Sequence, residues 1–251
     1  MTVLALLLLL AALVGAAVWA KFHGWFHPGN AMKYAPSRLQ PDPESSLQGK
    51  TIFCLGSSVT RGMASRGVSF VDYIARLDGC IMIREAVSAS TLADTSPRSY
   101  LRRLRRHPAV KQPIDCFLCQ LSTNDATFCS HMGKVSDSYD PSSFDSRTSV
   151  GGMETIIAFA RETWGCPIVF FTGTRFDNPR YHKEVNLLLE LEEKWNITVI
   201  DLWHDEKLNQ LTQEERRLYM NDGIHPTMAG YLLWWTPVIR QALRKTLEGT
   251  K

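Results

Sequence analysis

The amino-acid sequence predicts an α/β fold, a doubly wound sandwich in which a five-stranded parallel sheet lies between two layers of helices. Two observations lead to this class. Five short apolar segments alternate with helical patterns along residues 50–251. These segments also run with little polar interruption, as strands do when a parallel sheet buries both of their faces. A chain of 251 residues can hold one such domain and an N-terminal appendage.

The N-terminal appendage is apolar. Residues 3–20 carry no charged side chain and are long enough to cross a hydrocarbon core as a helix. Residues 1–20 are therefore a retained membrane anchor or a signal peptide cleaved after Ala20. We favour the anchor because the apolar run exceeds the usual core of a signal peptide and aromatic residues follow it, as at a membrane interface. These aromatic residues are Trp19, Phe22, Trp25 and Phe26.

Residues 21–49 contain four prolines and no helical or strand period, which predicts a semi-extended linker to a domain over 50–251. The chain has 28 basic and 25 acidic residues, and four of the basic but only two of the acidic ones precede residue 51. The domain is therefore nearly neutral, which gives no charge argument for nucleic acid as a partner. We expect the domain to be membrane-anchored or exported, on the extracytoplasmic side, although no Lys or Arg precedes the apolar run to fix its orientation.

The domain begins with a predicted strand, Thr51–Leu55, whose apolar run stops at a glycine. Apolar residues at helical spacing follow over 69–77 and stop at an Asp-Gly pair. A second strand over 80–84 leads into a small, polar turn. Ser96-Pro97 opens a helix that ends with the basic run 100–106. We interpret its arginines as a solvated face, with contact to lipid headgroups or to nucleic acid as the alternatives.

The second half repeats these two patterns. Its apolar runs predict three more strands, and its amphipathic spacing predicts four helices. The strands are 114–121, 167–172 and 197–202, and the helices are 153–164, 181–195, 212–218 and 228–247. Residues 126–148 have no period, and a loop of this length is often functional. We expect four of its side chains to line the acyl or alcohol pocket of an enzyme: His131, Met132, Tyr139 and Phe144.

The six cysteines do not predict a disulfide framework or a metal site. Cys54, Cys116 and Cys119 lie in apolar runs, where a free cysteine behaves as a small hydrophobic residue. Residues 116 and 119 have the spacing of zinc ligands, but three positions along a strand place them on opposite faces. Pairing among the other three cysteines, Cys80, Cys129 and Cys166, stays open.

Four polar clusters each follow a predicted strand, so they should gather at one edge of the sheet. They are Ser57-Ser58, Ser88-Ala89-Ser90, Asn124-Asp125, and Asp222 with His225. Ester hydrolysis needs a hydroxyl nucleophile, an imidazole base, a carboxylate that orients the imidazole, and donors for the oxyanion. Ser58 can attack, His225 can take its proton and Asp222 can orient His225. Asn124 and backbone amides can hold the oxyanion, and protonation of His225 should abolish activity in acid.

The clusters also carry a family resemblance. Gly56-Ser57-Ser58-Val59-Thr60 resembles the Gly-Asp-Ser-Leu block of the SGNH hydrolases, also called the GDSL esterase/lipase family. The other three conserved blocks of that family resemble Ala86–Thr91, Ser122–Asp125 and Asp222–Pro226. The resemblance covers residues 50–247 and implies a flavodoxin-like α/β/α sandwich that hydrolyses esters without a metal or organic cofactor. It implies Ser58 as nucleophile, Asp222 and His225 as its partners, and the Asn124 side chain and the amides of Ser58 and Ala89 as oxyanion donors.

Ala89 departs from the family, which has an oxyanion glycine at this position. If the backbone there requires a positive φ, alanine costs roughly 1 kcal/mol or more and could tilt the amide. Three functions therefore stay open: an esterase or deacylase, which we favour, an acyltransferase acting on a cell-surface sugar, and a binding protein that retains the fold. The sequence does not distinguish a small-molecule or carbohydrate ester from a lipid ester, and it does not indicate an oligomeric state.

Overall fold

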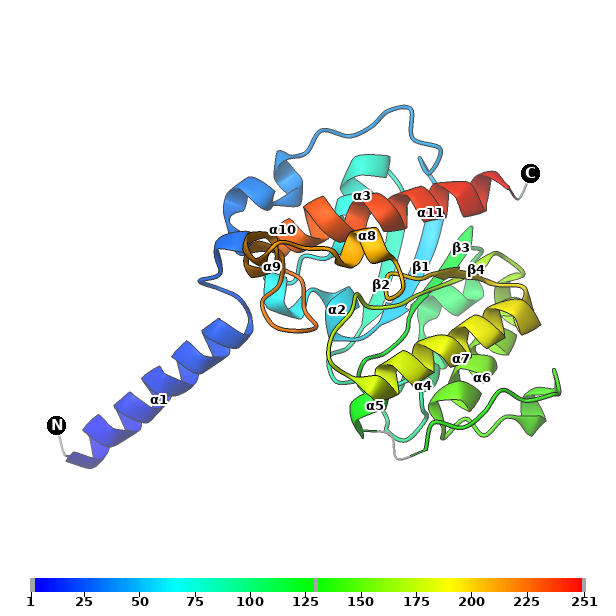
Figure 1. Ribbon diagram of the computed structural model, residues 1–251, viewed down its shortest axis with the longest axis horizontal. Helices are drawn as coiled ribbons and strands as arrows, with labels where there is room; N and C mark the ends of the chain where they lie inside the picture. Colours follow the sequence, from blue (N-terminus) through cyan, green and yellow to red (C-terminus); the bar gives the residue numbers. More distant parts are fainter. Residues whose placement is uncertain (1–2, 129–130, 250–251) are drawn as a thin grey trace.

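The computed structural model describes residues 3–128 and 131–249, and its five strands form one parallel sheet in the order β2-β1-β3-β4-β5 (Figure 1). The strands are β1 (Thr51–Gly56), β2 (Ile81–Ala86), β3 (Cys116–Gln120), β4 (Ile168–Phe171) and β5 (Thr198–Ile200). The predicted fold class is confirmed. Each strand lies within one or two residues of its predicted position, except that β3 and β5 are shorter at their ends.

Strand β1 lies between β2 and β3 and pairs with both, so that Cys54 lies beside Arg84 on one side and Leu118 on the other. The chain moves outward from β1 to β2 and then crosses to β3. This reversal of strand order opens a crevice beyond the carboxyl ends of β1 and β3, where ligands of open α/β sheets bind.

Helices cover both faces of the sheet, which gives the three layers of Figure 1. One face carries α3 and α11 over a core that includes Ile52 and Phe171, and the other carries α4, α6 and α7 over a core that includes Phe53 and Phe170. The helices are α1 (Val3–Phe22), α2 (Ser58–Arg61), α3 (Phe70–Asp78), α4 (Tyr100–Arg106), α5 (Asp125–Phe128), α6 (Ser149–Trp164), α7 (Pro179–Trp195), α8 (Glu206–Asn209), α9 (Gln213–Tyr219), α10 (Met228–Gly230) and α11 (Thr236–Glu248).

Two helix boundaries differ from the prediction for local reasons. Helix α6 begins four residues early because the Thr148 side chain accepts a hydrogen bond from the Gly151 amide and caps the first turn. The predicted closing helix is divided into α10, a π-helical turn (Tyr231–Trp235) and α11. Pro237 lacks the amide that would bond to the carbonyl four residues earlier, and its ring would crowd that carbonyl, so the preceding turn widens.

The cysteines of the described residues are all free. Cys116 belongs to the core on the α3 side of the sheet and Cys119 to the core on the α7 side, so the two thiols do lie on opposite faces. Burial raises the pKa of both thiols well above its ordinary value, which suits core packing rather than reactivity. Cys80 and Cys166 are not paired with each other, and Cys129 lies outside the described residues.

The long segment after β3 does not line the crevice as expected. The Tyr139 hydroxyl donates a hydrogen bond to the Lys194 carbonyl at 2.9 Å, and the rings of Tyr139 and Phe144 meet Trp195 edge to face. Trp195 ends α7 just before β5 begins, which places these contacts near the amino ends of the strands. The Met132 side chain packs against the core. The prediction that this segment forms the acyl or alcohol pocket was therefore wrong for Tyr139 and Phe144, and it stays a prediction for His131 and Met132.

Helix α1 projects from the domain, and the chain after it packs against the domain (Figure 1). No residue of α1 is buried, and the helix is long and apolar enough to cross a membrane by length and composition. The segment predicted as a linker instead forms three short 3-10 turns and buries Asn30 and Leu47 completely. Its prolines start two of these turns, and its polar groups bond to the domain, which composition alone did not reveal.

Candidate active site

The turn after β1 places Ser58 at the crevice. Strand β1 ends at Gly56, and α2 begins at Ser58 with Ser57 in the capping position. A Cβ atom at Gly56 would lie 2.0 Å from the Thr60 hydroxyl, so the turn back into α2 requires glycine here. Ser58 is only 5% exposed, and its hydroxyl therefore has a fixed environment.

Gln120, the last residue of β3, holds this turn in place. Its side-chain oxygen accepts hydrogen bonds from the Ser57 amide at 3.0 Å, the Thr60 amide at 3.2 Å and the Thr60 hydroxyl at 2.7 Å. Its side-chain nitrogen donates to the Ser57 hydroxyl at 3.0 Å. Ser57 is therefore committed to the turn, which leaves Ser58 as the serine whose hydroxyl can react.

His225 and Asp222 lie beside Ser58 in the predicted order. The Ser58 Oγ is 2.8 Å from the Nε2 atom of His225, and the Nδ1 atom of His225 is 2.8 Å from the Asp222 Oδ2. Both residues belong to the loop that an isolated bridge between Met220 and Pro226 closes. The Asp222 Oδ1 also accepts the amides of Ile224 and His225, each at 2.8 Å, so the carboxylate both shapes the loop and contacts the imidazole.

The charge of Asp222 is well supported. Burial alone would raise the pKa of this carboxyl, but the hydrogen bond and charge of His225 and the two backbone amides outweigh burial, so its pKa lies below the ordinary value. Asp222 is therefore ionised at neutral pH. An ionised carboxylate on Nδ1 favours the tautomer in which Nε2 is free to accept a proton from Ser58.

The backbone at Ala89 has a φ of 61°, the left-handed conformation that glycine adopts without strain. Two polar side chains from the end of β3 bind the next residue in this turn: the Asn124 Nδ2 donates to the Ser90 carbonyl at 2.9 Å, and the Ser122 hydroxyl donates to it at 3.0 Å. Ala89 and Asn124 thus lie in adjoining turns at the crevice, as predicted. Alanine at position 89 keeps the backbone conformation expected of the family's glycine.

Arg103 and Asp125 form hydrogen bonds that hold the turn containing Ala89 and Ser90. The Arg103 Nη2 donates to the Gly56 carbonyl at 2.9 Å and to the Ser90 hydroxyl at 3.1 Å, and its Nη1 pairs with Glu85 at 2.6 Å. Asp125 accepts the amides that follow Ser90 in the turn, those of Leu92 at 2.8 Å and Ala93 at 2.9 Å. Burial raises the pKa of Asp125 to about 6 despite these hydrogen bonds.

The sequence analysis missed Gln120 and the role of Arg103. A polar Gln at the end of an apolar strand was a usable signal, because a buried amide needs partners and the adjacent turn offers them. Arg103 stood in a basic run that we interpreted as a solvated face, but its side chain is only 10% exposed. Among the residues that the structure describes, no group of three or more His, Cys, Asp or Glu side chains could hold a metal ion.

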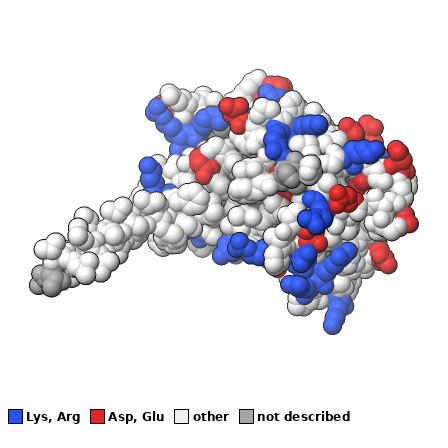
Figure 2. Space-filling view, turned by 90° about the horizontal axis from the view of Figure 1, so that it is seen from below, with Lys and Arg blue, Asp and Glu red and all other residues white. Residues whose placement is uncertain are grey.

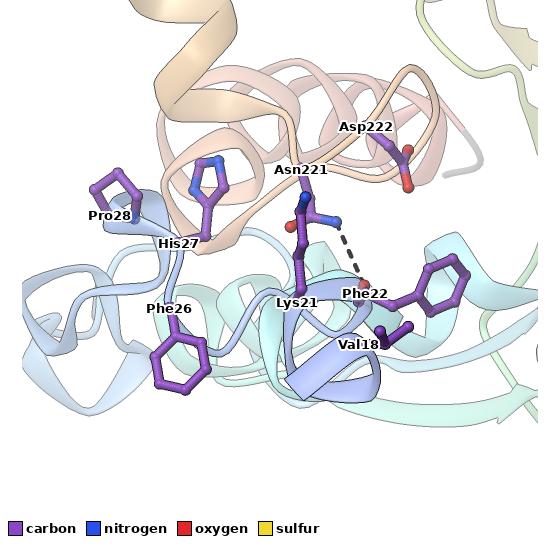
Figure 3. A pocket seen from close by; sticks show the side chains of 8 residues that line it. All are labelled: Val18, Lys21, Phe22, Phe26, His27, Pro28, Asn221 and Asp222. Carbon is purple, nitrogen blue, oxygen red and sulfur yellow. Dashed lines mark hydrogen bonds between the residues drawn. The ribbon is translucent and has the colours of Figure 1, made fainter. Parts of the chain in front are cut away.

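Two hollows, each of about 500 Å³, flank these residues at the base of α1. The first lies beside Asp222 and is mainly apolar (Figure 3), and the second lies beside Ser88 and contains three arginines. The first is lined by Val18, Lys21, Phe22, Phe26, His27, Pro28, Asn221 and Asp222. The second is lined by Trp19, His23, Trp25, Arg61, Met63, Arg66, Gly67, Val87, Ser88 and Arg98.

Comparisons with known proteins identify the family and the fold. Residues 54–233 match the model of the GDSL-like lipase/acylhydrolase family. A comparison with curated proteins gives no match. Among solved structures, the chain resembles a protein from Lactobacillus plantarum at a TM-score of 0.65 and 18% identity, over 81% of this chain and 99% of that one.

Two esterases are also similar in structure. The acetyl xylan esterase AlAXEase matches with a TM-score of 0.56 and 14% identity, over 77% of this chain and 99% of that one. Est24, a carbohydrate acetylesterase from Sinorhizobium meliloti, matches with a TM-score of 0.54 and 14% identity, over 80% of this chain and 100% of that one. Likenesses at this level of identity support the fold.

Proposed function

The chain belongs to the GDSL-like lipase/acylhydrolase family and is an ester hydrolase, and from this premise we propose that it cleaves carboxylic esters with a Ser58–His225–Asp222 triad. One observation carries the proposal. The three side chains form a continuous hydrogen-bonded row, with 2.8 Å at each of its two contacts. This row has the order of nucleophile, base and orienting carboxylate that acyl transfer requires.

The proposed reaction has two halves. The Ser58 Oγ attacks the ester carbonyl carbon while the Nε2 atom of His225 accepts its proton, and the resulting tetrahedral adduct collapses as His225 protonates the departing alcohol. Water then attacks the acyl-serine and gives a proton to His225, and His225 returns this proton to the Ser58 Oγ as the carboxylic acid leaves. Asp222 stays ionised and stabilises the imidazolium in both halves.

The oxyanion of each adduct needs donors on the side away from His225. We assign the amides of Ser58 and Ala89 and the side chain of Asn124 to this role. The Asn124 Nδ2 donates to the Ser90 carbonyl at 2.9 Å and makes a longer contact of 3.4 Å with the Ser122 hydroxyl, and the oxyanion would replace this weaker second partner. Removing one such donor typically costs about a hundredfold to a thousandfold in kcat.

Residues 1–20 supply the proposed tether. With a retained anchor the enzyme acts at a membrane surface, and with a cleaved signal peptide it acts as an exported domain. The two esterases of similar structure act on acetylated carbohydrates, so an O-acetyl or O-acyl group on a sugar is one substrate class to test. Analysis of products with and without a sugar acceptor separates hydrolysis from acyl transfer.

Labelling with a fluorophosphonate probe tests the triad, because the probe reacts with an activated serine. The full chain in detergent should label, and the Ser58→Ala and His225→Ala variants should not. The matched control is Ser57→Ala, which removes the neighbouring hydroxyl and should keep its label. We expect hydrolysis of 4-nitrophenyl butyrate to fall by at least about a thousandfold in Ser58→Ala. Unchanged turnover in that variant would refute the assignment and favour a binding role for the fold.

A further inference from the structure

The proposed active site lies at the point where α1 meets the domain. Asn221, next to Asp222 in the sequence, donates a side-chain hydrogen bond to the Phe22 carbonyl at 3.3 Å (Figure 3). Figure 3 shows Phe22 and Val18, from the end of α1, below the turn that carries Asp222. A helix of 20 residues spans about 30 Å, the thickness of a hydrocarbon core, so its last turn falls at the membrane surface.

The end of α1 is held firmly against the domain. The Asn30 side chain is fully buried; its Nδ2 donates to the carbonyls of Gly24 at 2.7 Å and Ala64 at 2.8 Å, and its Oδ1 accepts the Met228 amide at 2.8 Å. The Arg66 side chain donates to the Trp25 carbonyl at 2.6 Å. These contacts join the chain after α1 to the segment that follows α2 and to the first residue of α10, and so fix the end of α1 relative to the triad.

The last turn of α1 separates the two hollows. Val18, Lys21 and Phe22 share one helix face and line the hollow beside Asp222, whereas Trp19 and His23 share another face and line the hollow beside Ser88. Four aromatic side chains remain open to the surroundings near this turn, and Phe26 is the most open at 83% exposed. The four, Trp19, Phe22, Trp25 and Phe26, have the amphipathic character of residues at a membrane interface.

The two hollows differ in chemistry. The hollow beside Asp222 is lined by mainly apolar groups and suits an acyl chain (Figure 3). The hollow beside Ser88 holds Arg61, Arg66 and Arg98, and no carboxylate from the described part of the chain lines it. None of these three arginines takes part in a salt bridge within the described residues. Figure 2 shows no charged side chain along the outer part of α1; Lys21 lies in its last turn, and basic side chains with some acidic ones lie on the domain near its base.

We propose that the substrate is the acyl ester of an anionic amphiphile taken from the membrane surface. Its acyl chain enters the apolar hollow beside Asp222, and its anionic group binds Arg61, Arg66 and Arg98 in the hollow beside Ser88. The ester then lies between the hollows, where Ser58 begins α2 and Ala89 follows Ser88. Guanidinium groups bind phosphate oxygens in pairs, which makes a phosphate-bearing lipid the best match for three arginines. This assignment rests on the proposed esterase function.

A pair of lipids that differ only in the anionic group tests the assignment. Dihexanoyl phosphatidate and dihexanoylglycerol carry the same two acyl esters, and the full chain can hydrolyse both in the same detergent micelles. We expect kcat/KM to be at least about tenfold higher for the phosphatidate, mainly through KM. The preference should shrink as NaCl is raised, because salt screens exposed charges. Equal rates for the two lipids would overturn the proposal.

Variants locate the preference in the hollow. The double variant Arg61→Gln/Arg98→Gln should lose most of the preference for phosphatidate. The matched control, Arg105→Gln/Arg106→Gln, removes the same charge from the exposed end of α4 outside the hollow and should keep the preference. Equal loss of both hydrolytic rates in the first variant would mean that the arginines support the site in general, and would refute a headgroup role.

Two further arms separate the possible failures. Inorganic phosphate lacks acyl chains and should compete only weakly with phosphatidate. If phosphate inhibits strongly and the enzyme does not prefer either lipid, the hollow binds a free anion, and the lipid assignment is overturned. If the wild type reacts with the fluorophosphonate probe but hydrolyses neither lipid, the lipid substrate is wrong and the serine esterase stands. If it neither labels nor hydrolyses 4-nitrophenyl butyrate, the proposed function itself fails, and the lipid assignment fails with it.

Discussion

Replacement of Ala89 by glycine tests whether the backbone is strained in the turn whose Ala89 amide we assign to the oxyanion. The φ of 61° at Ala89 lies in the left-handed region, which costs an ordinary L-residue about 1–2 kcal/mol. Glycine removes this cost but gives the unfolded chain more freedom, which offsets about 0.4–1 kcal/mol. We therefore expect Ala89→Gly to raise the free energy of unfolding by about 0.5–1 kcal/mol, or Tm by about 1–4 °C for a chain of this length.

The catalytic consequence follows from the same angle. Because alanine already adopts the conformation that glycine would take, the Ala89 amide needs no reorientation, and kcat/KM should stay within about twofold in Ala89→Gly. Ala89→Val should lower the free energy of unfolding by more than about 1 kcal/mol, since a β-branched side chain is disfavoured at positive φ. Loss of activity in the valine variant with the fold retained would place the amide of residue 89 at the oxyanion.

Thermal unfolding of the full chain in detergent, followed by tryptophan fluorescence, measures these differences. Ala75→Gly in the middle of α3 is the matched control, and it should lose about 1 kcal/mol because its backbone is helical. If Ala89→Gly is destabilised as much as the control, the turn does not have a left-handed residue at position 89. A large gain in kcat/KM in Ala89→Gly would show instead that alanine tilts the oxyanion donor.

Two other predictions concern buried polar groups. Gln120→Met should destabilise the fold by about 2–3 kcal/mol and lower kcat by at least about tenfold, since the buried amides of Ser57 and Thr60 lose their acceptor. Thermal unfolding measures the loss of stability, and the rate of probe labelling measures the loss of reactivity. Unchanged kinetics would mean that Gln120 does not help to position Ser58. Burial, aided by the charge of Asp125, raises the pKa of Glu184 from 4.5 to about 8, so its contribution to stability is present below pH 4.5 and is lost as the pH rises through 8. Glu184→Gln should therefore unfold like the wild type near pH 4.5 and at a higher temperature above pH 8, and parallel curves of Tm against pH would contradict the assigned burial.

The sequence located the residues of the proposed triad better than the residues that hold them in place. Ser58 and His225 could be found because chemically active side chains that follow parallel strands must meet at one edge of the sheet, whatever the loops do in detail. Gln120 and Arg103 act through contacts between segments far apart in the chain, and no local pattern records such contacts. The residue-126–148 segment was misplaced for the same reason: its aromatic residues suited a pocket, but Trp195 at the other end of the domain offers them a better packing partner.

The segment after α1 shows most clearly what composition hides. Prolines and polar residues predicted a semi-extended linker, but the Asn30 amide satisfies three backbone groups at once, and a buried amide with all of these partners specifies one position for the chain. Asn30→Ala should therefore loosen the end of α1 and weaken any preference that depends on the two hollows, with less effect on small soluble esters.

Cleavage of the N-terminal segment and its retention as an anchor would therefore have different consequences at the proposed active site. Cleavage after Ala20 would remove Val18 and Trp19, one from the lining of each hollow, and would leave a new amino group on Lys21, within the hollow that Asp222 lines. A retained anchor keeps Val18 and Trp19 in the linings of the two hollows and would place the proposed triad at the lipid surface. The anchored form is thus the one in which the aromatic side chains around the end of α1, open in the structure, have an apolar environment to enter.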